Sequence, residues 1–205
     1  MAAPVPMAVQ NLEAHIKSIR IVCGHRKSSQ FHGQEGSFIS REKLRNYLLR
    51  DENLENLLDA LNIPLVNLED IRNYYLRIFV ILIQLNRAQK VLSFIGNPSL
   101  TDRYLPFRNK DLWPQECQEF FEEFFIQQWE YCVKKWKTGR LTGFKLENEA
   151  LLPIVTEKIL RDGSNSCTRE IEVYHEYNCL DKLVSIPALS RSKTYDFLLK
   201  INGIE

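Results

Sequence analysis

Residues 151–178 carry the sequence LLPIVTEKILRDGSNSCTREIEVYHEYN, whose pattern differs from everything before it. Two runs, 154–160 and 168–174, mix β-branched and charged residues, and the polar segment 161–167 between them contains Gly163. Such runs on either side of a Gly, Asn and Ser cluster are typical of a β-hairpin. We therefore expect a small hairpin whose loop covers residues 161–167.

The chain before this hairpin has the periodicity of helices. Apolar residues recur at helical spacing in the segments 11–21, 41–49, 53–61, 68–86 and 116–135. Ser40 and Asn67 each precede one of these segments, and both residue types favour the N-cap position of a helix. Segment 68–86 is apolar over most of its surface, which predicts a central helix. The expected fold is mainly α, a helical N-terminal bundle followed by a small β-hairpin.

Changes in composition suggest three parts. Residues 1–10 have no periodic pattern, and we expect them to be disordered. The glycine-containing segment 138–143 breaks the last helical pattern. This predicts a helical region over residues 11–140 and a separate segment over 150–205. We expect the end of that segment, 180–205, to be mobile.

Charge and cysteine content restrict the class of protein. The chain has 205 residues and a net charge of +1, so no global field would attract nucleic acid or an acidic membrane. The strongest apolar run, 78–83, is far shorter than the ~20 residues that span a bilayer. The five cysteines are odd in number and follow an N-terminus without a secretion signal. We expect reduced thiols and an intracellular, cytoplasmic protein, with the nucleus as an open alternative.

Sequence patterns that carry catalysis or metal binding are missing. Cys23, His25 and His32 lie in one polar segment, but they lack the closely spaced ligand pairs of zinc sites, and we interpret them as loop residues. The sequence contains no nucleophile elbow, no P-loop and no H-E-x-x-H motif. We therefore expect no metal site.

Aromatic residues are concentrated in and just before the segment 116–135. Most residues of this kind pack into cores, but any that stay exposed would form a docking surface for another protein. The candidates for partner binding are Trp113, Phe121, Phe125, Trp129 and Trp136. The basic cluster 134–137 follows acidic residues on the same predicted helix, which complements the helix dipole and does not indicate nucleic-acid binding.

Four short motifs occur in an order that resembles filamentous-fungal protein kinases. They are DRYLPF at 102–107, FFIQQW at 124–129, LPIV at 152–155 and VYHEYN at 173–178. Residues 38–178 resemble the helical region upstream of the kinase domain together with the first hairpin of the kinase N-lobe. The resemblance implies a truncated kinase-like protein in which residues 150–205 form a partial N-lobe segment.

The chain departs from the kinase pattern at the residues that carry the chemistry. The glycines of the kinase loop G-x-G-x-x-G-x-V fall on Arg161, Gly163 and Ser166, so only one of the three remains. The strand that supplies the phosphate-binding lysine is matched best by residues 184–187, with Pro187 in the place of that lysine. No H-R-D or D-F-G segment is present. We expect no enzymatic activity and no cofactor. The alternative is ATP binding through Gly163, Ser164 and Ser166.

These observations lead to a function hypothesis with two alternatives. We expect a non-catalytic helical module for regulation or interaction, which binds a protein partner or a kinase body in cis. Residual nucleotide binding is the first alternative, and an unrelated helical adaptor is the second. Because the hairpin would lack the rest of its lobe, we expect the apolar surface around residues 154–173 to favour self-association.

Overall fold

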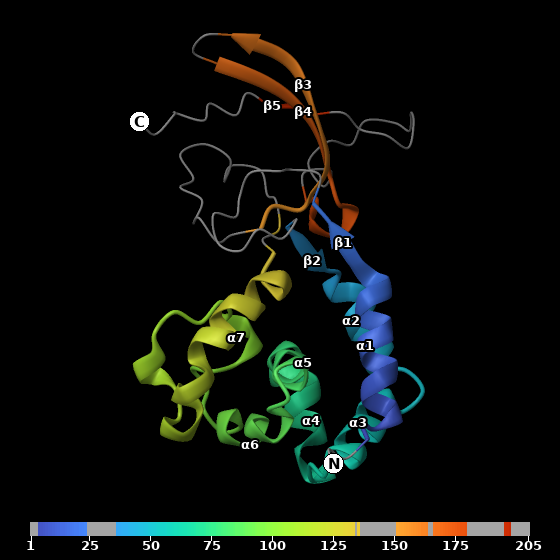
Figure 1. Cartoon of the computed structure of the whole chain (residues 1–205), viewed down its shortest axis with the longest axis vertical. Helices are drawn as coiled ribbons and strands as arrows, with labels where there is room; N and C mark the ends of the chain where they lie inside the picture. The colour runs from blue at the N-terminus through green and yellow to red at the C-terminus, as the bar shows by residue number, and fades with distance from the viewer. Residues whose placement is uncertain are drawn as a thin grey trace. The chain divides into compact units, whose positions relative to one another are not determined.

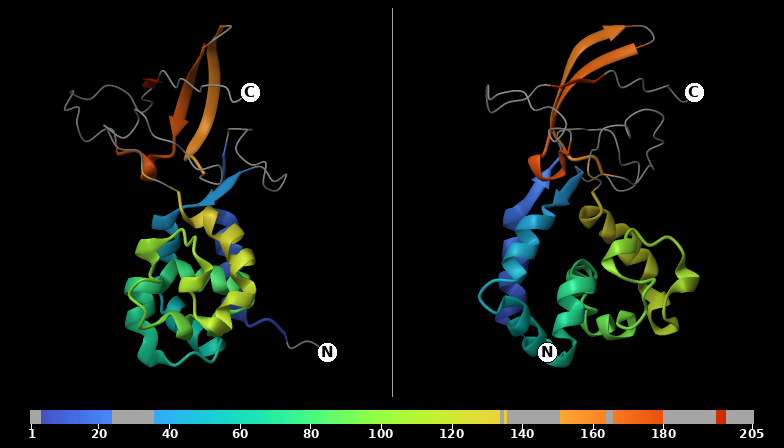
Figure 2. Two further views of the ribbon diagram at one scale, coloured as in Figure 1. Left: turned by 90° about the vertical axis from the view of Figure 1, so that its left-hand side faces the viewer. Right: turned by 180° about the vertical axis from the view of Figure 1, so that it is seen from behind.

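The structure is a computed structural model that describes residues 4–23, 36–133, 135, 151–163, 166–179 and 195–197. The chain forms two compact units, one of residues 1–20 and 39–132 and one of residues 21–38 and 133–205. The fold is mainly helical, with short antiparallel strand pairs in addition (Figures 1 and 2). Segment 21–38, which the sequence places with the helices, belongs to the second unit. The boundary after Cys132 lies before the predicted one at residue 140.

The helical unit begins with helix α1, Met7–Ile19. Its buried residues follow helical spacing, which explains why this segment folds against the rest of the unit: they are Val9, Leu12, Ile16 and Ile19. Pro6 precedes the helix, and its backbone oxygen accepts hydrogen bonds from the amides of Val9 and Gln10. Residues 7–10 are therefore helical, which corrects the predicted disordered N-terminus of ten residues.

Helices α2, Arg41–Leu48, and α3, Asn53–Ala60, follow. The predicted N-cap of α2 is confirmed, since Ser40 Oγ accepts a hydrogen bond from the Lys43 amide at 3.2 Å. Between the two helices Asp51 and Glu52 adopt positive φ angles of 51° and 57°, which ends one helix before the other begins. α1 packs against both helices.

Replacement of Ser40 by alanine should destabilise the helical unit by about 1 kcal/mol, because the Lys43 amide loses its acceptor. Urea unfolding followed by circular dichroism measures this change. The matched control is Ser18→Ala, since the exposed Ser18 hydroxyl donates to a carbonyl within α1 and caps no helix. Equal stability of both variants would show that the Ser40 cap contributes nothing.

The predicted central helix 68–86 is present but interrupted. It consists of α4, Leu68–Asp70, a π-helical turn η2, Ile71–Tyr75, and α5, Leu76–Gln84. Asn67 occupies the predicted N-cap position of α4, but its side chain donates to Pro64 O and makes no cap hydrogen bond. A short 3-10 turn η1, Leu65–Asn67, leads into α4. α5 lies between α1–α3 and α7 (Figure 1), and seven of its nine residues are buried: Leu76, Ile78, Phe79, Val80, Ile81, Leu82 and Ile83.

Short helices and an aromatic cluster complete the unit. The helices are η3, Ala88–Lys90; α6, Val91–Phe94; η4, Asp102–Tyr104; η5, Lys110–Leu112; η6, Gln115–Phe120; α7, Phe121–Gln127; and η7, Gln128–Tyr131. The predicted helix 116–135 is therefore α-helical only in its middle, and regular structure ends at Tyr131. Trp113 lies at the centre of the aromatic cluster, with its ring centroid 4.9–5.7 Å from four phenylalanine rings: Phe94, Phe120, Phe121 and Phe124.

The second unit contains strands and no described α-helix. β1, Arg20–Val22, pairs with β2, Ser37–Ile39, at its border with the first unit, and the Cys23 amide donates to Gly36 O at 2.7 Å. β3, Ile154–Gly163, and β4, Ser166–Val173, form the predicted antiparallel hairpin, visible in both views of Figure 2. β5, Tyr195–Phe197, pairs with β4. A 3-10 turn η8, His175–Tyr177, follows β4.

The hairpin loop is shorter than predicted. Strand pairing continues to Gly163 opposite Ser166, so the strands include most of the expected loop 161–167. Most of the mobile C-terminus expected over 180–205 lies outside the described residues, apart from β5.

Candidate functional site

The predicted partner-binding aromatic residues are largely part of the core. Trp113 is 3% exposed and Trp129 is 7% exposed, so neither can contact a partner without unfolding of its surroundings, which corrects their assignment as docking residues. Phe121 is buried as well, at 6%. Phe125 is half-buried and packs against the rings of Phe121 and Trp129. Trp136 lies outside the described residues.

The described residues of the predicted nucleotide-binding loop show no geometry that supports ATP binding. Gly163 ends β3 and Ser166 begins β4, and the two face each other across the ladder. Ser164 lies outside the described residues. ATP binding at this turn therefore remains a prediction that rests on the sequence alone.

The thiols of the helical unit and of Cys23 are poor nucleophiles. Burial raises the pKa of Cys132 to about 12 and that of Cys23 to about 11, and it also raises the pKa of Cys117. A thiol with a raised pKa stays protonated at neutral pH and reacts slowly. Among the described residues, no three His, Cys, Asp or Glu side chains cluster as metal ligands, and no helix is long and apolar enough to cross a membrane.

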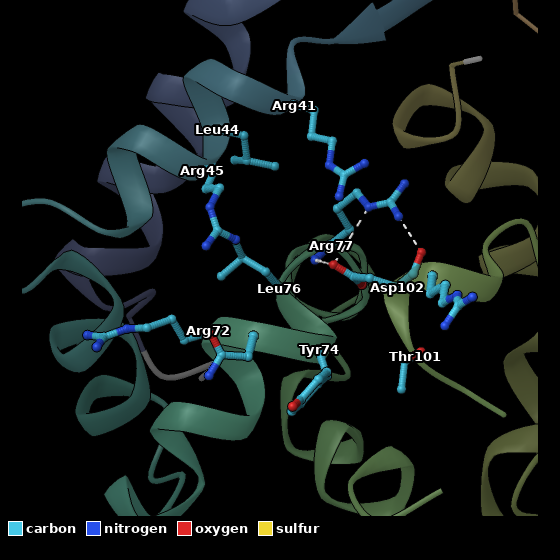
Figure 3. Close-up of a pocket in the computed structure, with 11 residues that line it drawn as sticks. Arg41, Leu44, Arg45, Arg72, Tyr74, Leu76, Arg77, Thr101 and Asp102 are labelled. Atoms are coloured by element: carbon cyan, nitrogen blue, oxygen red, sulfur yellow. Dashed lines mark hydrogen bonds and ion pairs between the residues drawn. The ribbon is translucent and has the colours of Figure 1, made fainter. Parts of the chain in front are cut away.

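The most distinctive polar feature of the helical unit is a pocket of about 330 Å³ that is lined by five arginines. They come from four elements: Arg41 and Arg45 from α2, Arg72 from η2, Arg77 from α5, and Arg103 from η4. Asp102 is the only carboxylate among the described residues of the lining. Figure 3 shows Arg41 extending from α2 toward Arg77, and Arg45 extending from α2 toward Leu76. We call this site the arginine pocket.

Asp102 holds the start of α5. Its Oδ2 accepts from the Arg77 amide at 2.9 Å, and its Oδ1 accepts from the Ile78 amide at 3.1 Å. These are the second and third residues of α5, whose amides a helix N-cap normally satisfies. The preceding residue, Tyr75, makes no side-chain cap. A carboxylate from a distant turn therefore acts as the N-cap where the π-helical turn has interrupted the helix.

The Arg77 side chain links this N-cap to η7. Its guanidinium donates to the backbone oxygen of Asp102 and, at 2.9 Å, to Tyr131 O, and its Nε lies 3.6 Å from Asp102 Oδ2. The two side chains are only 12% and 16% exposed. Burial raises the pKa of the Asp102 carboxyl, and the cations of Arg77 and Arg41 together with the two amide donors offset part of that rise. The Asp102 carboxylate is thus already paired with hydrogen-bond donors and a cation within the protein.

Gln128 fixes the loop that carries Asp102. Its side chain is fully buried; Oε1 accepts from the Phe107 amide at 2.7 Å and Nε2 donates to Phe107 O at 2.9 Å. The Gln128 side-chain amide thus both accepts from and donates to the backbone of one residue, as a paired residue of a neighbouring β-strand would do. Gln128 belongs to η7 and Phe107 to the loop after η4, so the contact holds two segments together. It also limits the motion of the chain that follows Asp102.

The other arginines differ in how far they are neutralised. Arg72 forms ion pairs with Glu55 at 2.9 Å and with Glu69 at 2.8 Å. Arg45 forms no ion pair with any residue that the structure describes. The pocket therefore retains positive charge after its internal pairs are made. Such a pocket can bind an anion, because guanidinium groups donate in a planar fork that matches carboxylate and phosphate oxygens.

Sequence reasoning missed this pocket, although parts of its signal were visible. Arg41 and Arg45 are four residues apart in a predicted helix and so share one face. Asp102 lies in the DRYLPF motif, and Gln128 lies in the FFIQQW motif. The structure gives both motifs a stabilising role within the helical unit. Comparisons with protein-family models, with curated proteins and with solved structures found no match for this chain.

Proposed function

We propose that the chain is a non-catalytic interaction module whose helical unit binds an anionic segment of a protein partner in the arginine pocket. The observation that carries the proposal is the lining itself: five arginines from four elements and, among the described residues, a single carboxylate that is already bonded to the start of α5. Arg72 and Arg77 are neutralised by carboxylates, whereas Arg45 forms no ion pair with any residue that the structure describes and so adds positive charge to the pocket.

Two sources of the anionic segment follow from the sequence resemblance. One is a separate protein, and the other is a kinase body in the same polypeptide, whose conformation the helical unit would then regulate. The kinase-like character of residues 150–205, their self-association and the cytoplasmic location remain part of this proposal, and each rests on the sequence. The geometry of the described residues does not favour nucleotide binding by the hairpin over binding of an anionic segment by the arginine pocket.

Charge reversal of the pocket should abolish recognition of acidic peptides. The probe is a fluorescent peptide pool with four adjacent glutamates between randomised positions, compared with a pool that has glutamines in their place. We expect the glutamate pool to bind the full chain and to dissociate as salt rises, because the contact is between ions. The double variant Arg41→Glu/Arg45→Glu should bind it at least ~10-fold more weakly, since a hydrogen bond to a charged group contributes about 1.5–3 kcal/mol. Fluorescence anisotropy measures both effects.

The control for this experiment is Arg87→Glu, a change of an exposed arginine of the same unit outside the pocket. Thermal unfolding of all variants shows whether the fold is kept. Equal binding of the glutamate and glutamine pools, or equal weakening by the Arg87 variant, would contradict the proposed function.

A further inference from the structure

We infer that the anionic segment bound by the arginine pocket carries a bulky apolar side chain next to its acidic residue, and that Tyr74 selects for this side chain. The inference rests on the proposed function and adds the kind of segment that the pocket prefers. It assigns Tyr74 as a specificity-determining residue of the site.

Charge alone gives this pocket little affinity for a partner segment. Arg72 and Arg77 are already bonded within the protein. Arg45 forms no ion pair with any residue that the structure describes, but its side chain is exposed. An ion pair between exposed groups changes an equilibrium constant by about fivefold at most. Selective binding of a partner segment therefore needs contacts other than charge.

Apolar side chains lie in the same lining as this exposed charge. Leu44 immediately precedes Arg45 on α2 and lines the pocket, as does Leu76 of α5. Both leucines are buried in the core of the helical unit, so this part of the lining is fixed in place. Figure 3 shows Arg45 extending from α2 toward Leu76. A ligand whose carboxylate contacts Arg45 thus places its neighbouring atoms near apolar lining.

Tyr74 adds a large exposed surface to the apolar lining. It belongs to the π-helical turn η2, two residues before Leu76, and its side chain is 54% exposed. The next residue, Tyr75, is buried, and its hydroxyl donates to Asn97 O at 3.4 Å. Core packing therefore accounts for Tyr75 but leaves more than half of Tyr74 uncovered. A tyrosine ring offers a large, rigid contact area and loses little conformational entropy when a partner covers it.

The size of the pocket also exceeds what an acidic group fills. Its volume is about 330 Å³, whereas a water molecule takes up about 30 Å³ of the liquid. A carboxylate has three heavy atoms and so fills only a minor part of this space. A second side chain, bulky and apolar, fills the remainder against Tyr74 and the two leucines.

Three peptide pools with randomised flanks test the inference, and fluorescence anisotropy follows their binding to the full chain. The apolar acidic pool has a central glutamate between two phenylalanines, and the polar acidic pool has a glutamate between two serines. The apolar neutral pool has a glutamine between two phenylalanines. We expect the apolar acidic pool to bind at least ~10-fold more tightly than the polar acidic pool, because burial of one phenylalanine side chain contributes roughly 10- to 100-fold. It should bind about two- to fivefold more tightly than the apolar neutral pool, which lacks the carboxylate.

Variants of Tyr74 show whether this residue makes the selection. Tyr74→Ser should weaken binding of the apolar acidic pool by about tenfold and leave that of the polar acidic pool within about twofold. Tyr74→Phe keeps the ring and should retain the affinity of the parent chain. The matched control is Leu112→Ser, which changes an exposed apolar residue of the same unit outside the pocket and should leave binding unchanged. Thermal unfolding midpoints check that all variants keep the fold.

Other results would overturn the inference in distinguishable ways. If the two acidic pools bind equally, or if Tyr74→Ser and Leu112→Ser have the same effect, the inference fails and the proposed function stands. Equal losses in Tyr74→Phe and Tyr74→Ser would assign the effect to the hydroxyl and also overturn it. If the apolar neutral pool binds as tightly as the apolar acidic pool, or if no pool binds, including the pool with four adjacent glutamates, the proposed function fails with it.

Discussion

Asp102→Asn should lower the free energy of unfolding of the helical unit by about 3–5 kcal/mol, the range found when one partner of a buried ion pair is removed. An asparagine keeps one acceptor oxygen, but its amide nitrogen then faces a backbone amide that also donates. One of the Arg77 and Ile78 amides loses its acceptor, and the Arg77 guanidinium loses the carboxylate beside it. Urea denaturation followed by circular dichroism gives the measurement.

Two further variants separate this effect from a general response to mutation. Asp59→Asn changes an exposed carboxylate at the end of α3 and should alter stability by less than about 0.5 kcal/mol. The double variant Asp102→Asn/Arg77→Met should be less destabilised than the sum of the two single variants, because the two residues share one interaction. A loss below about 1 kcal/mol for Asp102→Asn, or full additivity in the double variant, would show that Asp102 does not hold the start of α5.

The same residue links stability to the proposed binding. Asp102 supplies the only negative charge that the described residues bring to the lining of the arginine pocket, and the two α5 amides and Arg77 hold it in place. A free carboxylate at this position would compete with an incoming anion for the arginines of α2. Asp102 is oriented toward α5, and Arg45 forms no ion pair with any residue that the structure describes.

Local signals predicted the local structure well. Ser40 precedes a segment with helically spaced apolar residues, and this was enough to predict the N-cap of α2. The cap hydrogen bond is local, because it joins residues only three positions apart. The hairpin was predicted from its two strand-like runs, but its loop was not, because polar residues such as Arg161 and Asp162 favour turns only when no partner strand pairs with them. Register and loop length are decided by pairing across the hairpin.

Features that depend on distant contacts could not be predicted. The N-cap at the start of α5 is made by Asp102, which follows Arg77 by 25 residues. Burial of Trp113 depends on rings from five different positions, so the sequence could identify an aromatic cluster but not which members remain exposed. The arginine pocket is a case of the same kind, since only Arg41 and Arg45 are neighbours by helical spacing.

Gln128→Met should destabilise the helical unit by about 2–4 kcal/mol. Methionine has a similar volume, so the packing around position 128 is largely kept. It cannot bond to the Phe107 amide or carbonyl, and each buried polar group left without a partner costs about 1–3 kcal/mol. The matched control is Gln89→Met, because Gln89 is exposed and makes only one long hydrogen bond, 3.4 Å, to Leu61 O. Urea denaturation compares the two variants.

Amide hydrogen exchange tests the mechanism of this change directly. In the parent chain the Phe107 amide is buried and bonded at 2.7 Å, so it should exchange only when the contact with Gln128 opens. In Gln128→Met it should exchange at least ~100-fold faster than in the parent, measured against the Ile78 amide, which keeps its bond to Asp102. Equal acceleration at both amides would mean that the whole unit has been destabilised. That result would show that Gln128 contributes to overall stability without specifically holding the loop that carries Asp102.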